Sequence, residues 1–183
     1  MSQPILITGV SGSGKSALTR ALSGRGGRAV SLDAYPGLAY WTDANGVPAF
    51  RPPSPDITWL RTHRWIFDPL VLDQLIAIER ARPTRHTLIL CGVAANLAEL
   101  RDRFGRIVLL DIDPATQARR LTDSSRGNDF GRIGDSATWL ADTFDTERAR
   151  LHALADIVID ATPSLAQVAD TVITVIGGSD EQR

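Results

Sequence analysis

The stretch that decides the fold lies near the start of the chain and reads Gly9-Val10-Ser11-Gly12-Ser13-Gly14-Lys15-Ser16. It matches the pattern G-x-x-x-x-G-K-[ST] at every fixed position, with the apolar run 4–7 before it and a predicted helix after it. Glycines allow such a loop to fold into a concave nest whose N–H groups point toward phosphate oxygens, and the helix dipole adds positive potential. The sequence therefore predicts a strand, a phosphate-binding loop and a helix.

The side chains of this loop are suited to hold a nucleotide and its metal ion. Lys15 is expected to reach the β- and γ-phosphates, and the Ser16 hydroxyl is expected to bind Mg²⁺. Lys15 is the single lysine in a chain with 20 Lys and Arg residues, so the compact ammonium group stands where a phosphate nest uses one. The expected nucleotide contacts are Gly9, Ser11, Gly12, Ser13, Gly14, Lys15, Ser16 and Ala17.

Length and composition limit the alternatives. A chain of 183 residues is expected to form one domain, 1–183, with a small lid or insertion. The formal net charge of -1 argues against a dedicated nucleic-acid binder, since such proteins carry a net basic face. The one cysteine, Cys91, excludes an internal disulfide and suits a reducing cytoplasm, where we expect the protein to act. The apolar stretches are too short for a membrane-spanning helix.

Short apolar segments alternate with helical patterns along the chain. Strands are expected at 4–8, 28–32, 87–91, 106–110 and 156–160. Helices are expected at 15–22, 58–81 with a kink or break at Pro69, 95–103, 114–121, 136–153 and 164–176. This alternation predicts an α/β fold of three layers, in which a five-stranded parallel sheet has helices on both faces.

The carboxyl ends of the predicted strands carry the residues of chemical interest, and ligands bind at that edge of a parallel sheet. Asp33 follows the second strand and is our candidate for the general base that accepts a hydroxyl proton. Asp111 ends the fourth strand and, with Ser16 and Asp33, completes the candidate Mg²⁺ ligands. The alternative for both carboxylates is a structural one, in which they cap nearby backbone N–H groups.

The stretch 35–65 differs from its surroundings, because five prolines between residues 36 and 55 rule out a continuous helix there. We expect it to be an acceptor-binding insertion, in which Trp41 stacks on a base or sugar. Arg51, Arg61 and Arg64 flank it and are expected on the surface, with binding of an anionic acceptor as the alternative. The alternative is a surface loop pinned to the core by its aromatic residues. Trp59 and Trp65 are expected to pack in the core, within or near a helix.

Several segments resemble the phosphate-loop kinases of small molecules and nucleotides, namely the gluconate, shikimate, adenylate and uridine kinases. GVSGSGKS (9–16) resembles the gluconate kinase loop, and SLDAY (31–35) resembles an Asp-x-Phe-Tyr segment of uridine kinase. RIVLLDIDPATQARRL (106–121) resembles the segment that leads from the sheet into the lid. DIVIDATPSL (156–165) resembles the strand and turn that contact adenine in these enzymes.

The resemblance implies a lid at about 120–134 and further nucleotide contacts. The lid arginines that would clamp the phosphates are Arg120, Arg126 and Arg132, of which Arg126 joins Lys15 and Asp33 as a catalytic candidate. Thr162 and Pro163 would lie beside the adenine. One departure concerns the third strand, which in these kinases often ends in an acidic residue that helps to hold Mg²⁺. Here Cys91-Gly92 stands at that place, so Asp33 or Asp111 is expected to take the role.

Together these features predict a Mg²⁺- and ATP-dependent kinase that transfers the γ-phosphoryl group to a hydroxyl of a nucleoside, sugar or sugar acid, with Asp33 as the base. The alternatives are a nucleoside monophosphate kinase, a kinase of RNA ends, and a regulatory module that binds ATP without turnover. A GTPase is disfavoured because the guanine-reading N-K-x-D motif needs a second lysine. The expected partners are ATP and a small acceptor, without nucleic acid or membrane, and the sequence leaves a homodimer open.

Overall fold

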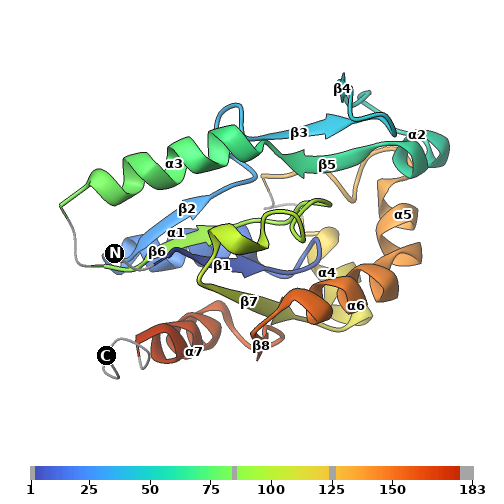
Figure 1. Ribbon diagram of the computed structural model, residues 1–183. Coiled ribbons are helices and arrows are strands. Elements are labelled where there is room, and N and C mark those ends of the chain that lie inside the picture. Colours follow the sequence, from blue (N-terminus) through green and yellow to red (C-terminus); the bar gives the residue numbers. More distant parts are fainter. Residues whose placement is uncertain (1–2, 84–85, 124–126, 178–183) are drawn as a thin grey trace.

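The computed structural model describes residues 3–83, 86–123 and 127–177, and its ribbon is drawn in Figure 1. The main sheet has five strands in the order β2-β6-β1-β7-β8, and all of its neighbouring pairs are parallel. Its strands are β1 (Ile5–Thr8), β2 (Arg28–Ser31), β6 (Leu88–Cys91), β7 (Arg106–Asp111) and β8 (Ile157–Asp160). The predicted five-stranded parallel sheet is therefore confirmed.

Helices cover both faces of this sheet, which confirms the three-layer α/β fold. In Figure 1, α3 lies above the main sheet and α7 lies below it, where α7 also packs against α1. The helices are α1 (Lys15–Gly24), α2 (Ile57–Thr62), α3 (Pro69–Ala81), α4 (Pro114–Leu121), α5 (Ser136–Asp142), α6 (Phe144–Leu154) and α7 (Leu165–Gly177). Across the described ranges, every helix is too short or too polar to span a bilayer.

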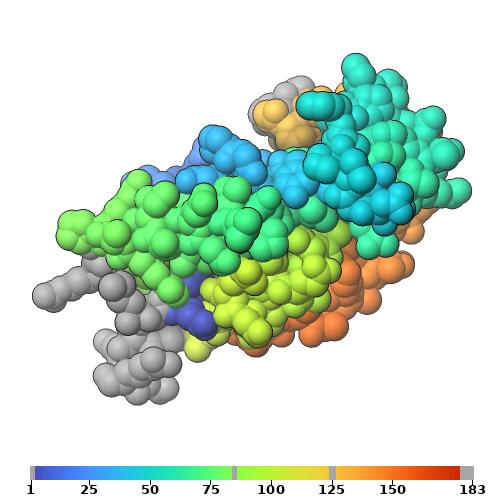
Figure 2. All heavy atoms as spheres, turned by 45° about the horizontal axis from the view of Figure 1, so that its top comes forward, coloured from blue at the N-terminus to red at the C-terminus, as the bar shows by residue number. Residues whose placement is uncertain are grey.

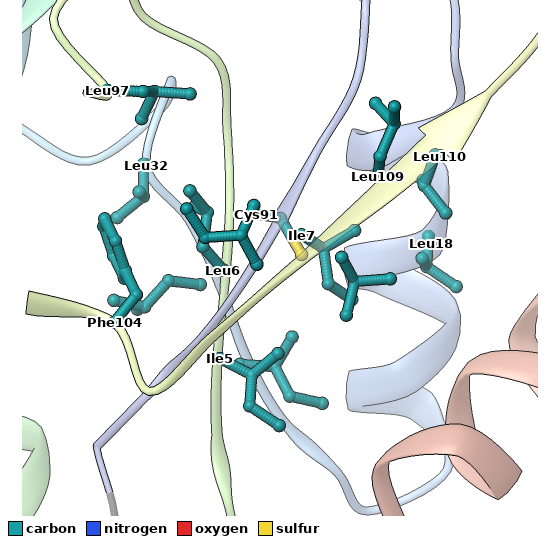
Figure 3. Packing of buried hydrophobic residues seen from close by; sticks show 14 of the residues in the cluster. Ile5, Leu6, Ile7, Leu18, Leu32, Cys91, Leu97, Phe104, Leu109 and Leu110 are labelled. Atoms are coloured by element: carbon teal, nitrogen blue, oxygen red, sulfur yellow. The ribbon is translucent and has the colours of Figure 1, made fainter. Parts of the chain in front are cut away.

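The core lies on both sides of β1, whose four residues are all buried. Side chains alternate along a strand, so successive residues of β1 reach opposite faces of the sheet. Figure 3 shows Leu6 on the side of Phe104 and Ile7 on the side of Leu18, which belongs to α1. A strand buried on both faces needs apolar residues at every position, and this requirement explains the unbroken apolar runs of the sequence.

A second, antiparallel sheet occupies the region of the predicted insertion. It contains β3 (Ala39–Thr42), β4 (Pro48–Ala49) and β5 (Arg64–Phe67), in the order β4-β3-β5. Figure 2 shows this sheet and α2, in cyan and teal, at one end of the molecule, with α3 in green along the neighbouring surface. The second sheet faces the carboxyl edge of the main sheet and so stands over the predicted ligand-binding edge.

The predicted helix over 58–81 is wrong in its middle. Helix α2 ends at Thr62, β5 follows, and α3 begins at Pro69. Asp68 caps α3 by accepting hydrogen bonds from the N–H groups of Leu70 and Val71. Pro69, at the first helical position, has no N–H group that would need an acceptor. Cross-strand pairing with β3 draws the intervening residues into a strand and overrides their helical spacing.

Two other predicted helices differ from the structure. Over 95–103 the chain forms turns and a single 3-10 helix, Arg101–Arg103, because the Asn96 side chain binds the backbone of β5. The helix predicted over 136–153 is interrupted at Thr143, which ends α5 and precedes α6. The Thr143 hydroxyl donates to the carbonyl of Trp139, a local bond that competes with a continuous helix.

Candidate active site

The phosphate loop joins β1 to α1 in a conformation that depends on its glycines. Gly12 and Gly14 have φ angles of +87° and +99°, in the left-handed region that side chains disfavour. At Gly9 a Cβ atom would lie 2.6 Å from the carbonyl oxygen of Leu110 and 2.5 Å from the Ser13 hydroxyl oxygen. The loop therefore presents its backbone in a close-packed nest where larger residues would not fit.

Lys15 is buried at the mouth of this nest. Its Nζ atom donates to the carbonyl oxygens of Gly9 at 2.7 Å and Val10 at 3.1 Å, and it lies 3.4 Å from the Ser13 hydroxyl. The ammonium group is thus held over the loop, where it can exchange these carbonyls for phosphate oxygens. Ser16, the next residue, is exposed on the first turn of α1.

Asp33 lies just after β2, and its carboxylate contacts two neighbouring segments. Oδ1 accepts a hydrogen bond from the indole Nε1 of Trp65 at 3.3 Å and a longer one from the N–H of Val93 at 3.5 Å. Burial raises the pKa of Asp33, while the Lys15 ammonium and these two donors act in the opposite direction. The influence of Lys15 means that the carboxylate and the phosphate loop share one site.

The end of β6 lacks an acidic residue because the second sheet packs there. A Cβ atom on Gly92 would lie 2.7 Å from Cζ of Phe67 and 2.9 Å from Cβ of Leu32. Cys91 is buried beside it, and burial raises the pKa of its thiol to about 11. At neutral pH this thiol is therefore neutral and acts as a small packing residue.

Arg120 brings the phosphate loop next to the turn after β8. Its Nη2 atom donates to the carbonyl of Ala161 at 2.8 Å, and Nη1 lies 3.4 Å from the carbonyl oxygen of Ser13. Thr162 and Pro163 follow in the same turn, where the Thr162 N–H and hydroxyl both donate to Asp160 Oδ1. The structure thus gathers these predicted nucleotide contacts, although Arg120 belongs to α4 and not to a separate lid.

The Asp111 carboxylate binds a side chain of α6. Its two carboxylate oxygens accept from Nε and Nη2 of Arg148 at 2.7 and 2.5 Å, and His152 Nε2 lies 3.3 Å from Oδ1. Arg148 accordingly holds the pKa of Asp111 below its usual range. The Asp111 carboxylate thus forms an ion pair with α6, which is neither the expected Mg²⁺ role nor the expected capping of backbone N–H groups.

Of the predicted lid arginines that the structure describes, Arg132 does not contact the phosphate loop as Arg120 does. Arg126 lies outside the described residues, and the Arg132 guanidinium donates to backbone carbonyls of its own segment, those of Asn128 at 3.2 Å and Asp123 at 3.5 Å. The segment 127–135 instead docks on the second sheet. Asp129 pairs with Arg51 at 3.1 Å.

Two hydrogen bonds of Asp135, one from its side chain and one from its backbone, continue this docking. Asp135 Oδ2 accepts from the N–H of Ile57 at 2.9 Å, and the Asp135 N–H donates to the carbonyl of Pro55 at 2.9 Å. At Gly134, whose φ is +48°, a Cβ atom would lie only 2.3 Å from that same carbonyl oxygen. Glycine therefore permits the lid segment and the insertion to pack backbone against backbone.

Aromatic rings gather where the lid segment meets the second sheet. The Trp41 ring centroid lies 5.0 Å from that of Trp59, 5.6 Å from that of Trp65 and 5.7 Å from that of Phe130. We call these four residues the aromatic cluster. Trp59 also stacks on His63 at 4.1 Å. Edge-to-face and tilted contacts of this kind favour a fixed arrangement of the rings.

Sequence reasoning missed two residues that shape this site. Trp65 was expected in the core near a helix, yet it lies on β5 and binds Asp33. Asn96 fixes β5 to the end of β6, since its Oδ1 accepts from the Phe67 N–H at 3.1 Å and its Nδ2 donates to the Phe67 carbonyl at 2.9 Å. The alternation of Trp65 and Phe67 was the available signal, and the longer helical pattern obscured it.

Comparisons with known proteins agree with the fold. Residues 5–136 match the sequence profile of a family described as "AAA domain", whereas no curated protein sequence shows significant similarity. A shikimate kinase from Acinetobacter baumannii, solved with shikimate, is 16% identical with a TM-score of 0.60, covering 100% of this chain and 97% of its own. A gluconokinase from Sinorhizobium meliloti is 17% identical, with a TM-score of 0.53 and coverages of 98% and 94%. A sugar kinase from a Janibacter species is 19% identical, with a TM-score of 0.56 and coverages of 97% and 95%.

Proposed function

Because the chain belongs to the AAA domain family and has the fold of the phosphate-loop kinases, we propose that it is an ATP-dependent kinase that phosphorylates a hydroxyl group of a small molecule. The observation that carries this proposal is the half-buried carboxylate of Asp33 beside Lys15 and its phosphate loop. A phosphate nest alone binds a nucleotide, but a carboxylate next to it adds a group that can accept a proton from the acceptor.

The proposed reaction is a direct transfer. The acceptor hydroxyl gives its proton to Asp33 and forms a bond to the γ-phosphorus of ATP, and the bond from that phosphorus to the β–γ bridging oxygen breaks to release ADP. Lys15 stabilises the charge that develops on the transferred group. A raised pKa suits Asp33 to this role, because a carboxylate that is costly to keep ionised takes up a proton readily.

The site also fits ATP and Mg²⁺. The positive-φ glycines form the phosphate nest, and Arg120 joins it to Thr162 and Pro163, which we assign to the adenine side. Among the described residues no group of three or more Asp, Glu, His or Cys could hold a metal ion by itself. Mg²⁺ would therefore be held by the exposed hydroxyl of Ser16 together with the phosphates, and it would neutralise charge on the nucleotide.

A hydroxyl acceptor explains the site better than a phosphate acceptor does. A nucleoside monophosphate would bring its negative charge toward the carboxylate of Asp33, which the buried site screens poorly. The printed names of the fold's relatives include shikimate kinase, gluconokinase and sugar kinase, which support a small hydroxyl-bearing acceptor. We place this acceptor between Asp33 and the second sheet.

The experiment is a coupled assay of ADP release with ATP, Mg²⁺ and a panel of sugars, sugar acids, nucleosides and nucleoside monophosphates. We expect release that depends on one acceptor class and falls at least about 100-fold in Asp33→Asn. Lys15→Ala should also lose transfer. Asp102→Asn, which removes an exposed carboxylate beside Gly105 at the far end of β7, is the matched control and should behave as wild type. Near-normal transfer in Asp33→Asn would refute the assigned base.

A further inference from the structure

The side of the second sheet that faces the site is set by its strand pairing. Trp41 and Trp65 are directly opposite each other on β3 and β5, and Ala39 is opposite Phe67 two residues along. Side chains two apart on a strand share a side, so these four lie on one side of the sheet. Phe67 is fully buried against Gly92, next to the end of β6. Trp41 and Trp65 therefore lie on the side that faces the carboxyl edge of the main sheet.

This aromatic side reaches the proposed base directly. The Trp65 indole donates to Asp33 Oδ1, so its ring lies within hydrogen-bond distance of the carboxylate. The Trp41 ring centroid lies 5.6 Å from that of Trp65 on the same side of the sheet. We call these two tryptophans the aromatic wall, and an acceptor hydroxyl at Asp33 would lie beside the Trp65 ring.

The charged side chains of this region do not belong to that wall. Arg64 lies one residue before Trp65 and so points to the opposite side of the sheet, where it lines a shallow depression of about 190 Å³ with Asp43 and Glu99. Arg51 is paired with Asp129 of the lid segment. Among the described residues of the second sheet, the acceptor thus meets two uncharged rings beside Asp33, while Lys15 lies on the side of the phosphate loop.

We infer that the acceptor is an uncharged, ring-bearing alcohol whose ring packs against Trp65 and extends toward Trp41, while its hydroxyl contacts Asp33. This inference rests on the proposed function and narrows it. Sugar rings present C–H groups and nucleobases present a π face to an indole, and both kinds of contact bury apolar surface. An acidic acceptor would place its charge near Asp33 without a cation from the wall, unlike a neutral one.

The first test uses acceptors that differ in charge. The unaltered protein is assayed with glucuronamide against glucuronate, and with methyl shikimate against shikimate, each with ATP and Mg²⁺, because the members of each pair share a ring and its hydroxyls and differ in charge. We expect kcat/KM to be at least about tenfold higher for the neutral member of a pair. Preference for the anionic member would overturn this inference while the proposed kinase activity stands. Transfer to none of a wider panel of neutral and acidic alcohols would overturn both.

The second test addresses the wall. Trp41→Leu removes a ring that we place against the acceptor, and the acceptor KM should rise about tenfold while the KM of ATP is unchanged. Trp41→Phe keeps a ring and should recover most of the loss. Trp139→Leu, in α5 and outside the wall, is the control. An unchanged acceptor KM in a folded Trp41→Leu protein would overturn the inference, and if that variant does not fold, the charge preference of the unaltered protein decides.

Discussion

Trp65→Phe tests the link between the second sheet and the base. The substitution keeps an aromatic ring on β5 and removes the indole N–H that donates to Asp33 Oδ1 at 3.3 Å. A hydrogen bond from this donor favours the ionised carboxylate, whereas the protonated form gains little from it. Losing the bond therefore raises the pKa of Asp33 further, in the same direction as burial already does.

The size of the effect follows from the geometry. Hydrogen bonds to charged groups contribute about 1.5–3 kcal/mol, and a 3.3 Å bond is longer than the usual one, so we take about 1.4 kcal/mol. That free energy corresponds to about a factor of ten between the two protonation states. The acid limb of kcat/KM should move to higher pH, and on that limb the variant should be about tenfold slower than wild type. Well above the limb both proteins hold Asp33 ionised, and their ratio should become constant.

Kinetics and spectroscopy can each test the expected rise in the pKa of Asp33. The first measurement is kcat/KM against pH for both proteins, with Trp59→Phe as a control that alters the same aromatic cluster without touching Asp33. The second is the indole ¹H–¹⁵N resonance of Trp65, which needs no acceptor and should titrate with Asp33 in wild type but not in Asp33→Asn. Lys15 is unchanged in Trp65→Phe, so it cannot produce the shift. An acid limb that stays in place in folded Trp65→Phe would refute the reasoning.

Three further predictions concern stability. Burial raises the pKa of Asp33, so the folded state binds its proton more tightly than the unfolded state, and stability falls as pH rises through the interval between the two pKa values. At neutral pH Asp33→Asn should therefore match or exceed the wild-type Tm in thermal unfolding while transfer is lost, and a clearly lower Tm would contradict this. Gly92→Ala places a Cβ atom 2.7 Å from Phe67 and should lower the free energy of unfolding by about 1–3 kcal/mol in urea, where an unchanged midpoint would argue against the close packing. Asn96→Ala removes both side-chain bonds to the Phe67 backbone and should cost about 2 kcal/mol in the same assay, whereas Glu99→Ala, an exposed neighbour, should cost almost nothing.

The main sheet was predictable because each of its strands is recognised from a few consecutive residues. Each strand is a short apolar run, and burial on both faces leaves few polar exceptions to confuse the pattern. The same pattern placed Asp33 at a strand end next to the phosphate loop, where the structure has it. A carboxylate at that edge of a parallel sheet is informative because topology, rather than a contact, determines its position.

The second sheet was not predictable because the residues that pair in it lie far apart in the sequence. Trp41 and Trp65 pair across 24 positions, and neither strand exceeds four residues, so no local period identifies them. The ion pair of Asp111 with Arg148 likewise joins residues 37 apart. In both cases the structural role of a residue depends on a partner that is distant in the sequence. Sequence reasoning therefore predicted the phosphate loop and the strand ends beside it, and it did not predict the second sheet.

The burial of Lys15 has a consequence for chemical labelling. Since it is the single lysine in a chain with 19 arginines among its 20 basic residues, an amine-directed acylating reagent can modify one side chain, and that side chain lies in the phosphate loop. Its Nζ is held by the carbonyls of Gly9 and Val10, and the residue is only 7% exposed. The rate of acylation therefore reports how often the loop opens, without an engineered probe, and a bound nucleotide should slow it further. Apart from three histidines, the other basic side chains of the sequence are guanidinium groups, which such reagents leave untouched.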